Sequence, residues 1–196
     1  MSEKTVRFLI VLTPDESKKL IAKAVAQMDV VKKAAKSGII LVNAGSTNFF
    51  LVEEITGKQP MARPPDVEKE TPDVFCGHTR PEGKCVEPAR IRFASREKAV
   101  PQWVIKNGEL IDWVHPDKYW RMMGPDDVYI KGANALDPQW NAIIEVAGDT
   151  GGTFGRHLST IYGRGMHFII PVGLEKFIPT PISEIIKEGG KQKIQY

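Results

Sequence analysis

The chain has 196 residues, of which 42% are hydrophobic and 26% charged, a composition typical of globular proteins. Its 27 basic and 24 acidic residues are interspersed, and a net charge of +3 gives too weak a field to indicate nucleic-acid binding. No run approaches the roughly 20 apolar residues of a membrane span, and the N-terminus lacks the features of a signal peptide. We therefore expect a cytoplasmic protein with no membrane or nucleic-acid partner.

The first part of the chain alternates apolar strands with helices. Residues 6–12 form a β-branched, apolar run that predicts a strand, and the next residues, from Thr13 to Glu16, supply a helix N-cap, a proline at the first helical position and a glutamate at N3. Apolar residues then recur at helical spacing as far as Gly38. Residues 39–42 are a continuous apolar run, typical of a strand buried on both faces, and a short helix is expected over 49–55.

Residues 58–114 interrupt this pattern and predict an insertion or arm within the domain. Six prolines lie between residues 60 and 88, where apolar residues show little periodicity. Further on, Asn107-Gly108 lies between two apolar runs and predicts a β-hairpin over 104–111, because these residues accept the positive φ angles of a type I′ turn.

The second part of the chain again alternates helices and strands. The pattern predicts a helix over 116–123, a strand over 128–130, a strand or short helix over 142–147, a helix over 153–162, a strand over 166–172 and a helix over 181–187. This order predicts a single α/β domain over residues 1–196, with a mostly parallel sheet, helices on both faces and the proline-rich and β-hairpin insertion.

Three loops rich in small residues follow predicted strands, at residues 43–48, 131–134 and 148–153. Because parallel strands end at the same edge of a sheet, we expect these loops to meet in one crevice. The first and third loops run into helix N-termini, whose N–H groups and dipole attract anions. We therefore predict a site for a phosphate or carboxylate group, although turn and capping roles explain each loop taken alone. The predicted binding residues are Gly45, Ser46, Thr47, Asn48, Lys131, Gly132, Asn134, Gly151, Gly152, Thr153 and Arg156.

Asp149 and His157 are the candidate general bases, because Asp149 sits inside the third loop and His157 about one turn into the following helix. A carboxylate that caps the helix explains Asp149 equally well. Cys76, His78 and Cys85 are potential metal ligands, but their spacing is poor and a fourth ligand is missing. Two reduced thiols, or less readily a nucleophilic cysteine, are the alternatives, and we expect no metal and no cofactor.

Two stretches of the chain carry a resemblance to known proteins. The segment 38–54, with Ala44-Gly45-Ser46-Thr47-Asn48 between strand and helix, is similar to the phosphate loop of ribose-5-phosphate isomerases. Residues 127–137, followed by Gly151-Gly152-Thr153 and the strand 168–172, look like the C-terminal half shared by initiation factor 2B-like proteins and lactate-utilisation domains. Over residues 38–57 and 126–173 the chain thus resembles the NagB/RpiA/CoA-transferase-like superfamily.

This resemblance implies a Rossmann-like sheet whose loops bind phosphosugars, acyl-CoA or related anions. By position, Gly45, Ser46 and Thr47 would form the phosphate loop, and the opposite wall would hold Gly132, Asn134, Gly151, Gly152 and Thr153. Asn134 stands where the isomerases carry an aspartate, and an amide cannot abstract a proton. The glutamate-centred motif of the CoA transferases is not evident either.

Three functions therefore stay open. The first is an isomerase or transferase that acts on a phosphosugar or CoA-type substrate. The second is a sensor or binding module that holds such a ligand without chemistry. The third is an interaction protein, a homodimer in which residues 60–88 are exchanged between subunits.

Overall fold

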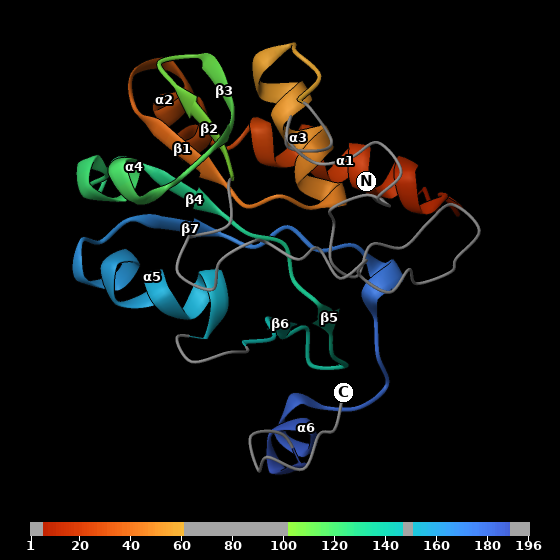
Figure 1. The fold of residues 1–196 in the computed structure, drawn as a ribbon. Coiled ribbons are helices and arrows are strands. Elements are labelled where there is room, and N and C mark those ends of the chain that lie inside the picture. Colours follow the sequence, from red (N-terminus) through yellow and green to blue (C-terminus); the bar gives the residue numbers. More distant parts are fainter. Residues whose placement is uncertain (1–5, 61–101, 147–150, 189–196) are drawn as a thin grey trace, which may run out of the picture.

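The computed structural model describes residues 6–60, 102–146 and 151–188 (Figure 1). Its centre is a five-stranded sheet in the order β3-β2-β1-β4-β7. The strands are β1 (Ile39–Val42), β2 (Gln102–Lys106), β3 (Glu109–Val114), β4 (Val128–Ile130) and β7 (His167–Ile169). β1 is parallel to β4 and β4 to β7, whereas β2 is antiparallel to both β1 and β3, so four of the five strands run in one direction. The expected α/β domain with a mostly parallel sheet is confirmed.

Helices cover both faces of this sheet because β1 is apolar on both sides. Ile40 and Val42 pack in one cluster with α1 (Pro14–Ala26), α2 (Asp29–Ser37) and α3 (Ser46–Thr56). Ile39 and Leu41 point to the other face, where they pack with α4 (Asp117–Met122) and α5 (Gly152–Gly163). The helices expected over 116–123 and 153–162 thus form and cover one face. None of the helices in the described ranges has the length and apolar character needed to cross a membrane.

The predicted hairpin forms and belongs to the main sheet. Asn107 and Gly108 both have positive φ angles, 49° and 81°, as a type I′ turn requires. β2 pairs directly with β1, with Val42 opposite Trp103, so the last part of the segment 58–114 is a component of the sheet. Residues 61–101, which include most of the proline-rich stretch, lie outside the described residues.

The C-terminal part of the domain carries short elements outside the main sheet. They are the two-stranded sheet of β5 (Ala135–Leu136) and β6 (Ala142–Ile143), the 3₁₀ helix η1 (Leu174–Lys176) and α6 (Ile182–Glu188). Asp137 joins the β5–β6 connection to the start of α6, because its carboxylate accepts hydrogen bonds from the backbone of Gln139, Asn141 and Ile182 and from the Asn141 side chain. Burial alone would raise the pKa of Asp137, but these hydrogen bonds outweigh burial and lower it.

The prediction of a strand over residues 6–12 is wrong for this structure. The segment pairs with no strand among the described residues, and Phe8, Leu9 and Val11 are 83%, 93% and 86% exposed. The apolar pattern indicates a segment suited to a strand, but a strand also needs a neighbouring strand with which to form hydrogen bonds. Both sides of β1 are already taken by β2 and β4, so a further strand has only the edges of the sheet left.

A part-buried turn fixes the start of β1. The Asp127 carboxylate accepts hydrogen bonds from the Ile39 N–H at 2.7 Å and from the Gly124 N–H at 2.8 Å. A Cβ on Gly38 would lie 2.8 Å from the same carboxylate, so the glycine that ends α2 is needed for this close approach. Its neighbour Asp126 instead forms an exposed ion pair with Lys33.

We expect Asp127→Ala to lower the free energy of unfolding by roughly 1–3 kcal/mol, because two part-buried N–H groups lose their acceptor. Asp126→Ala is the matched control and should leave stability almost unchanged, since exposed ion pairs contribute little. Urea unfolding of both variants measures the difference. Equal losses at the two positions would contradict the assigned role of Asp127.

Candidate functional site

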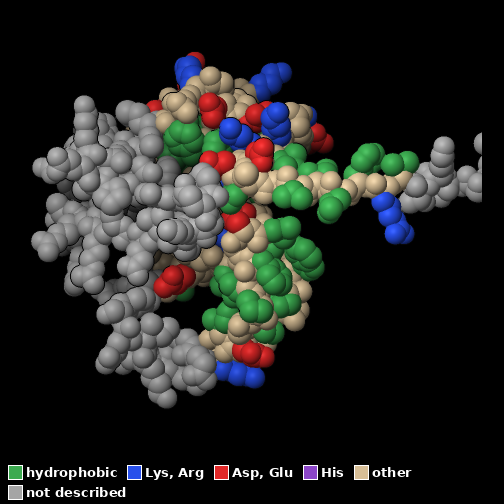
Figure 2. Space-filling view, turned by 90° about the vertical axis from the view of Figure 1, so that its right-hand side faces the viewer, with side chains coloured by type: hydrophobic (Ala, Val, Ile, Leu, Met, Phe, Trp, Pro, Cys, Tyr) green, Lys and Arg blue, Asp and Glu red, His purple; other side chains and the backbone are tan. Residues whose placement is uncertain are grey.

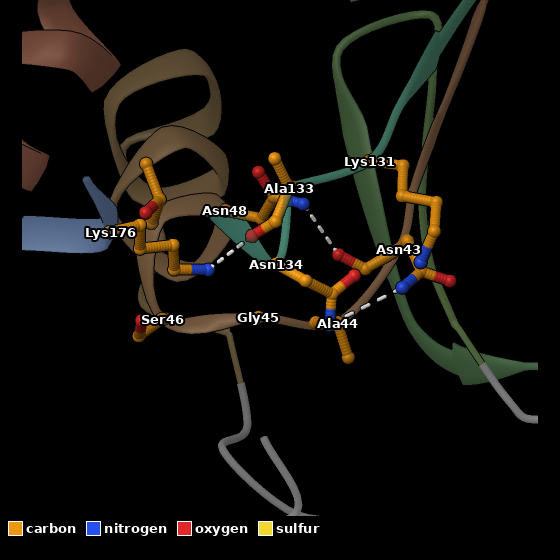
Figure 3. Close-up of a pocket in the computed structure, with 11 residues that line it drawn as sticks. Asn43, Ala44, Gly45, Ser46, Asn48, Lys131, Ala133, Asn134 and Lys176 are labelled. Carbon is orange, nitrogen blue, oxygen red and sulfur yellow. Dashed lines mark hydrogen bonds between the residues drawn. The ribbon is translucent and has the colours of Figure 1, made fainter. Parts of the chain in front are cut away.

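A cavity of about 80 Å³ lies where β1 and β4 end (Figure 3). The loop 43–48 leads from β1 into α3, and the loop 131–134 follows β4. The two loops are neighbours because Val42 is opposite Ile130 in the parallel pairing and the Asn43 N–H donates to the Ile130 carbonyl at 2.8 Å. The cavity is lined by Asn43, Ala44, Gly45, Ser46, Thr47, Asn48, Lys131, Gly132, Ala133, Asn134 and Lys176.

The N-terminus of α3 forms one wall of the cavity. Gly45 is its N-cap residue, and no side chain caps the helix there. Gly45 has an extended backbone, with φ 177°, and a Cβ at this position would meet only the Asn48 amide nitrogen, at 4.0 Å. The missing side chain therefore leaves space in front of the first turn, where N–H groups and the helix dipole favour an anion.

Asn48 brings a buried acceptor to the same wall. Asn48 is only 1% exposed, and its Nδ2 donates to the Asn43 carbonyl at 2.7 Å. That bond fixes the orientation of the amide, because the flipped amide would set two oxygens against each other. Oδ1 then has no hydrogen-bond partner among the described residues, so a ligand hydroxyl or a water molecule would satisfy it.

Two lysines approach the cavity from opposite sides (Figure 3). Lys131 follows β4 directly. Lys176 belongs to η1, and its Nζ donates to the Ala133 carbonyl at 2.5 Å. No aspartate or glutamate belongs to the lining residues within the described part of the chain. The cavity therefore carries two positive side chains and a helix N-terminus, an arrangement that suits a small anion.

Lys176 is the lining residue that the sequence did not single out. It lies in no recognisable motif, and its position depends on the path of the chain after β7. The sequence signal that bears on it is the predicted parallel sheet: β7 is parallel to β4, so the residues that follow β7 leave the sheet at the same edge as loop 131–134.

Gly151 and Gly152, the part of the third predicted loop whose position the structure fully describes, do not contribute to this cavity. Gly151, Gly152 and Arg156 are absent from its lining, and Thr153 lies in the first turn of α5. Gly151 and Gly152 have φ angles of 70° and 64°, and a Cβ on Gly151 would lie 3.1 Å from the Gly155 Cα. Glycine is therefore favoured at both positions because the backbone that enters α5 has positive φ angles there. Asp149 lies outside the described residues.

His157, the other candidate base, packs in the apolar cluster beneath the sheet and does not line the cavity. Its ring stacks on Trp120, with centroids 4.1 Å apart, and the residue is 7% exposed. Burial lowers the pKa of His157 to about 4, so the imidazole is neutral at pH 7. Its position indicates a packing role. Asn134 does line the cavity, and its Oδ1 accepts from the Glu145 N–H at 2.9 Å.

The chain has no match to a protein-family model, to a curated protein or to a solved structure. The resemblance to the NagB/RpiA/CoA-transferase-like superfamily therefore depends on the motifs alone. Within the described ranges no three metal-ligating side chains come together, and Cys76, His78 and Cys85 lie outside those ranges.

We expect the protein to lose stability as the pH falls from about 6.5 to about 4. In this range the unfolded chain takes up a proton on the imidazole of His157, while the folded protein does not. His157→Phe keeps a ring against Trp120 and should remove this part of the pH dependence. His115 is exposed and serves as the control, because His115→Gln should retain the loss of stability over this pH range. Urea midpoints across this pH range measure the effect, and an unchanged slope in His157→Phe would contradict it.

Proposed function

We propose that this protein binds a small anionic ligand, a phosphorylated sugar or a CoA-type molecule, through its phosphate or carboxylate group in the cavity between loops 43–48 and 131–134. The observation that carries this proposal is the convergence of an uncapped helix N-terminus with Lys131 and Lys176 around one small space. Backbone N–H groups at a helix start and lysine ammonium groups are common phosphate-binding elements.

The size of the cavity limits what enters it. A volume of about 80 Å³ is far below the roughly 300–1,000 Å³ of pockets that enclose drug-sized molecules. The anionic group would therefore sit inside, and the rest of the ligand would lie outside the cavity. The acceptor Oδ1 of Asn48 favours a ligand that also carries a hydroxyl, such as a sugar phosphate or a protonated phosphate.

The same arrangement supports membership of the NagB/RpiA/CoA-transferase-like superfamily as part of this proposal. Loop 43–48 lies between a strand and a helix, as the resemblance implies for the phosphate loop, and loop 131–134 lies beside it. Gly151 and Gly152, which the resemblance places on the opposite wall, are not among the lining residues in the described part of the chain.

Binding without turnover is the function that the described residues favour. The lining offers lysines, hydroxyls and amides, but no carboxylate and no imidazole in the described part of the chain. An isomerase or transferase remains the second candidate, with Asp149 as its base. In that case Asp149→Ala should abolish turnover of ribose 5-phosphate or of a CoA ester and leave phosphate binding intact. Turnover that survives in the variant would exclude Asp149 as the base.

We expect Lys176→Gln to weaken the binding of ribose 5-phosphate by about 10- to 100-fold, because one charge-assisted hydrogen bond contributes roughly 1.5–3 kcal/mol. Lys33→Gln is the matched control, because it also removes one positive charge but from an exposed ion pair outside the cavity. This variant should bind ribose 5-phosphate with the affinity of the native protein. Isothermal titration with ribose 5-phosphate, CoA and inorganic phosphate measures the affinities.

Equal weakening in both variants would indicate a general charge effect instead of a specific contact. A native protein that binds none of these three anions would contradict the proposed function.

A further inference from the structure

Residues 6–12, which we call the N-terminal arm, expose an unusual amount of apolar surface. Val6, Phe8, Leu9, Ile10 and Val11 are between 65% and 93% exposed, and Leu12 is 42% exposed. Figure 2 shows apolar side chains along a segment that projects away from the body of the molecule. Single exposed apolar residues are common in proteins, but six within seven successive positions mark a surface that is covered by another element or another chain.

The composition of the arm indicates what kind of partner covers it. It consists of β-branched, aromatic and aliphatic residues interrupted only by Arg7, and it contains neither glycine nor proline. Such residues favour a strand. A run that is apolar at successive positions, without alternation, is typical of a strand covered on both faces. The arm therefore fits best as an added strand in a sheet that is flanked by helices.

Among the described residues, β3 and β7 are the edge strands of the main sheet. β3 is six residues long, which matches the seven residues of the arm, whereas β7 has three residues and is followed closely by Pro171. Pro171 lacks an N–H and limits pairing along the β7 edge.

We propose that two copies of this chain exchange their N-terminal arms, and that each arm adds as an outer strand beside β3 of the other copy. The arm projects away from the body of its own chain and is therefore accessible to a second molecule (Figure 2). Two arms paired only with each other would form a two-stranded ribbon with both faces in water, which is marginally stable at best. Reciprocal exchange onto β3 extends each sheet by one strand and closes the assembly as a twofold dimer.

The mass of the particle in solution tests this exchange. Light scattering should give a dimer for the full chain and a monomer for both the deletion of residues 1–12 and the variant Leu9→Asp. Leu20→Asp is the matched control, since Leu20 lies on α1 and is 58% exposed outside the arm, and it should remain a dimer. The arm packs in neither apolar cluster of the sheet, so all variants should keep a cooperative thermal transition.

Hydrogen exchange locates the edge that receives the arm. Peptides that cover residues 6–12 and 109–114 should be protected in the full chain, and those over 109–114 should exchange faster in the deletion variant. A monomeric full chain, a dimer that survives the deletion, or a mass that grows without limit as concentration rises would overturn the exchange. Protection of 167–170 in place of 109–114 would overturn the assignment to β3. None of these outcomes bears on phosphate binding, which uses other residues.

Discussion

The pairing of β1 with β4, at the centre of the sheet, is the constraint on which the rest of this structure depends. Ile40, Leu41 and Val42 have no exposed surface, and the strand has a neighbour on each side. Because its side chains are apolar on both faces, helices must cover both faces, and the three-layer architecture follows. Because β1 and β4 run in the same direction, the chain leaves both strands at one edge of the sheet. Loops 43–48 and 131–134 are thus brought together by the pairing of these two strands.

The cavity between these loops shows how the edge of a sheet gathers polar and positive groups with few residues outside the two loops. The helix N-terminus, the small residue at Gly45 and the position of Lys131 all follow from the strand-to-helix connection and the end of β4. Lys176 is the addition, delivered by a segment that follows β7. Its ammonium group already donates to the Ala133 carbonyl, so the charge is held at the cavity by a backbone acceptor. An anion that enters would meet at Lys176 a positive group whose position is set before binding.

The elements that the sequence predicted correctly are those whose signals are local. Local sequence is sufficient to predict the conformation of three elements, namely the apolar strand 39–42, the Asn107-Gly108 turn and the helix α5. The arm at residues 6–12 has an equally strong strand signal, yet a strand also requires a free edge, and the sequence does not show whether one is within reach. Residues 142–147 were expected to form a strand or a short helix, and Ala142–Ile143 form the short strand β6, which pairs with β5 outside the main sheet.

The site was predicted in part, for a related reason. Glycines at 45, 151 and 152 look alike in the sequence, but Gly45 has an extended backbone that any residue could adopt, whereas Gly151 and Gly152 have left-handed φ angles. The first leaves space for a ligand and the other two serve a turn, and only the backbone distinguishes them. His157 and Lys176 show the opposite difficulty. Whether each side chain points into the apolar cluster or into the cavity depends on contacts with residues far away in sequence, namely Trp120 and Ala133.

The most direct test of the anion site is to follow the backbone amide resonances of the ¹⁵N-labelled protein while inorganic phosphate is added. The account predicts saturable shifts of the amides at residues 45–48 and 131–134, with those at 151–153 unaffected. Shifts confined to 151–153, or no saturable shift at either loop of the cavity, would contradict it.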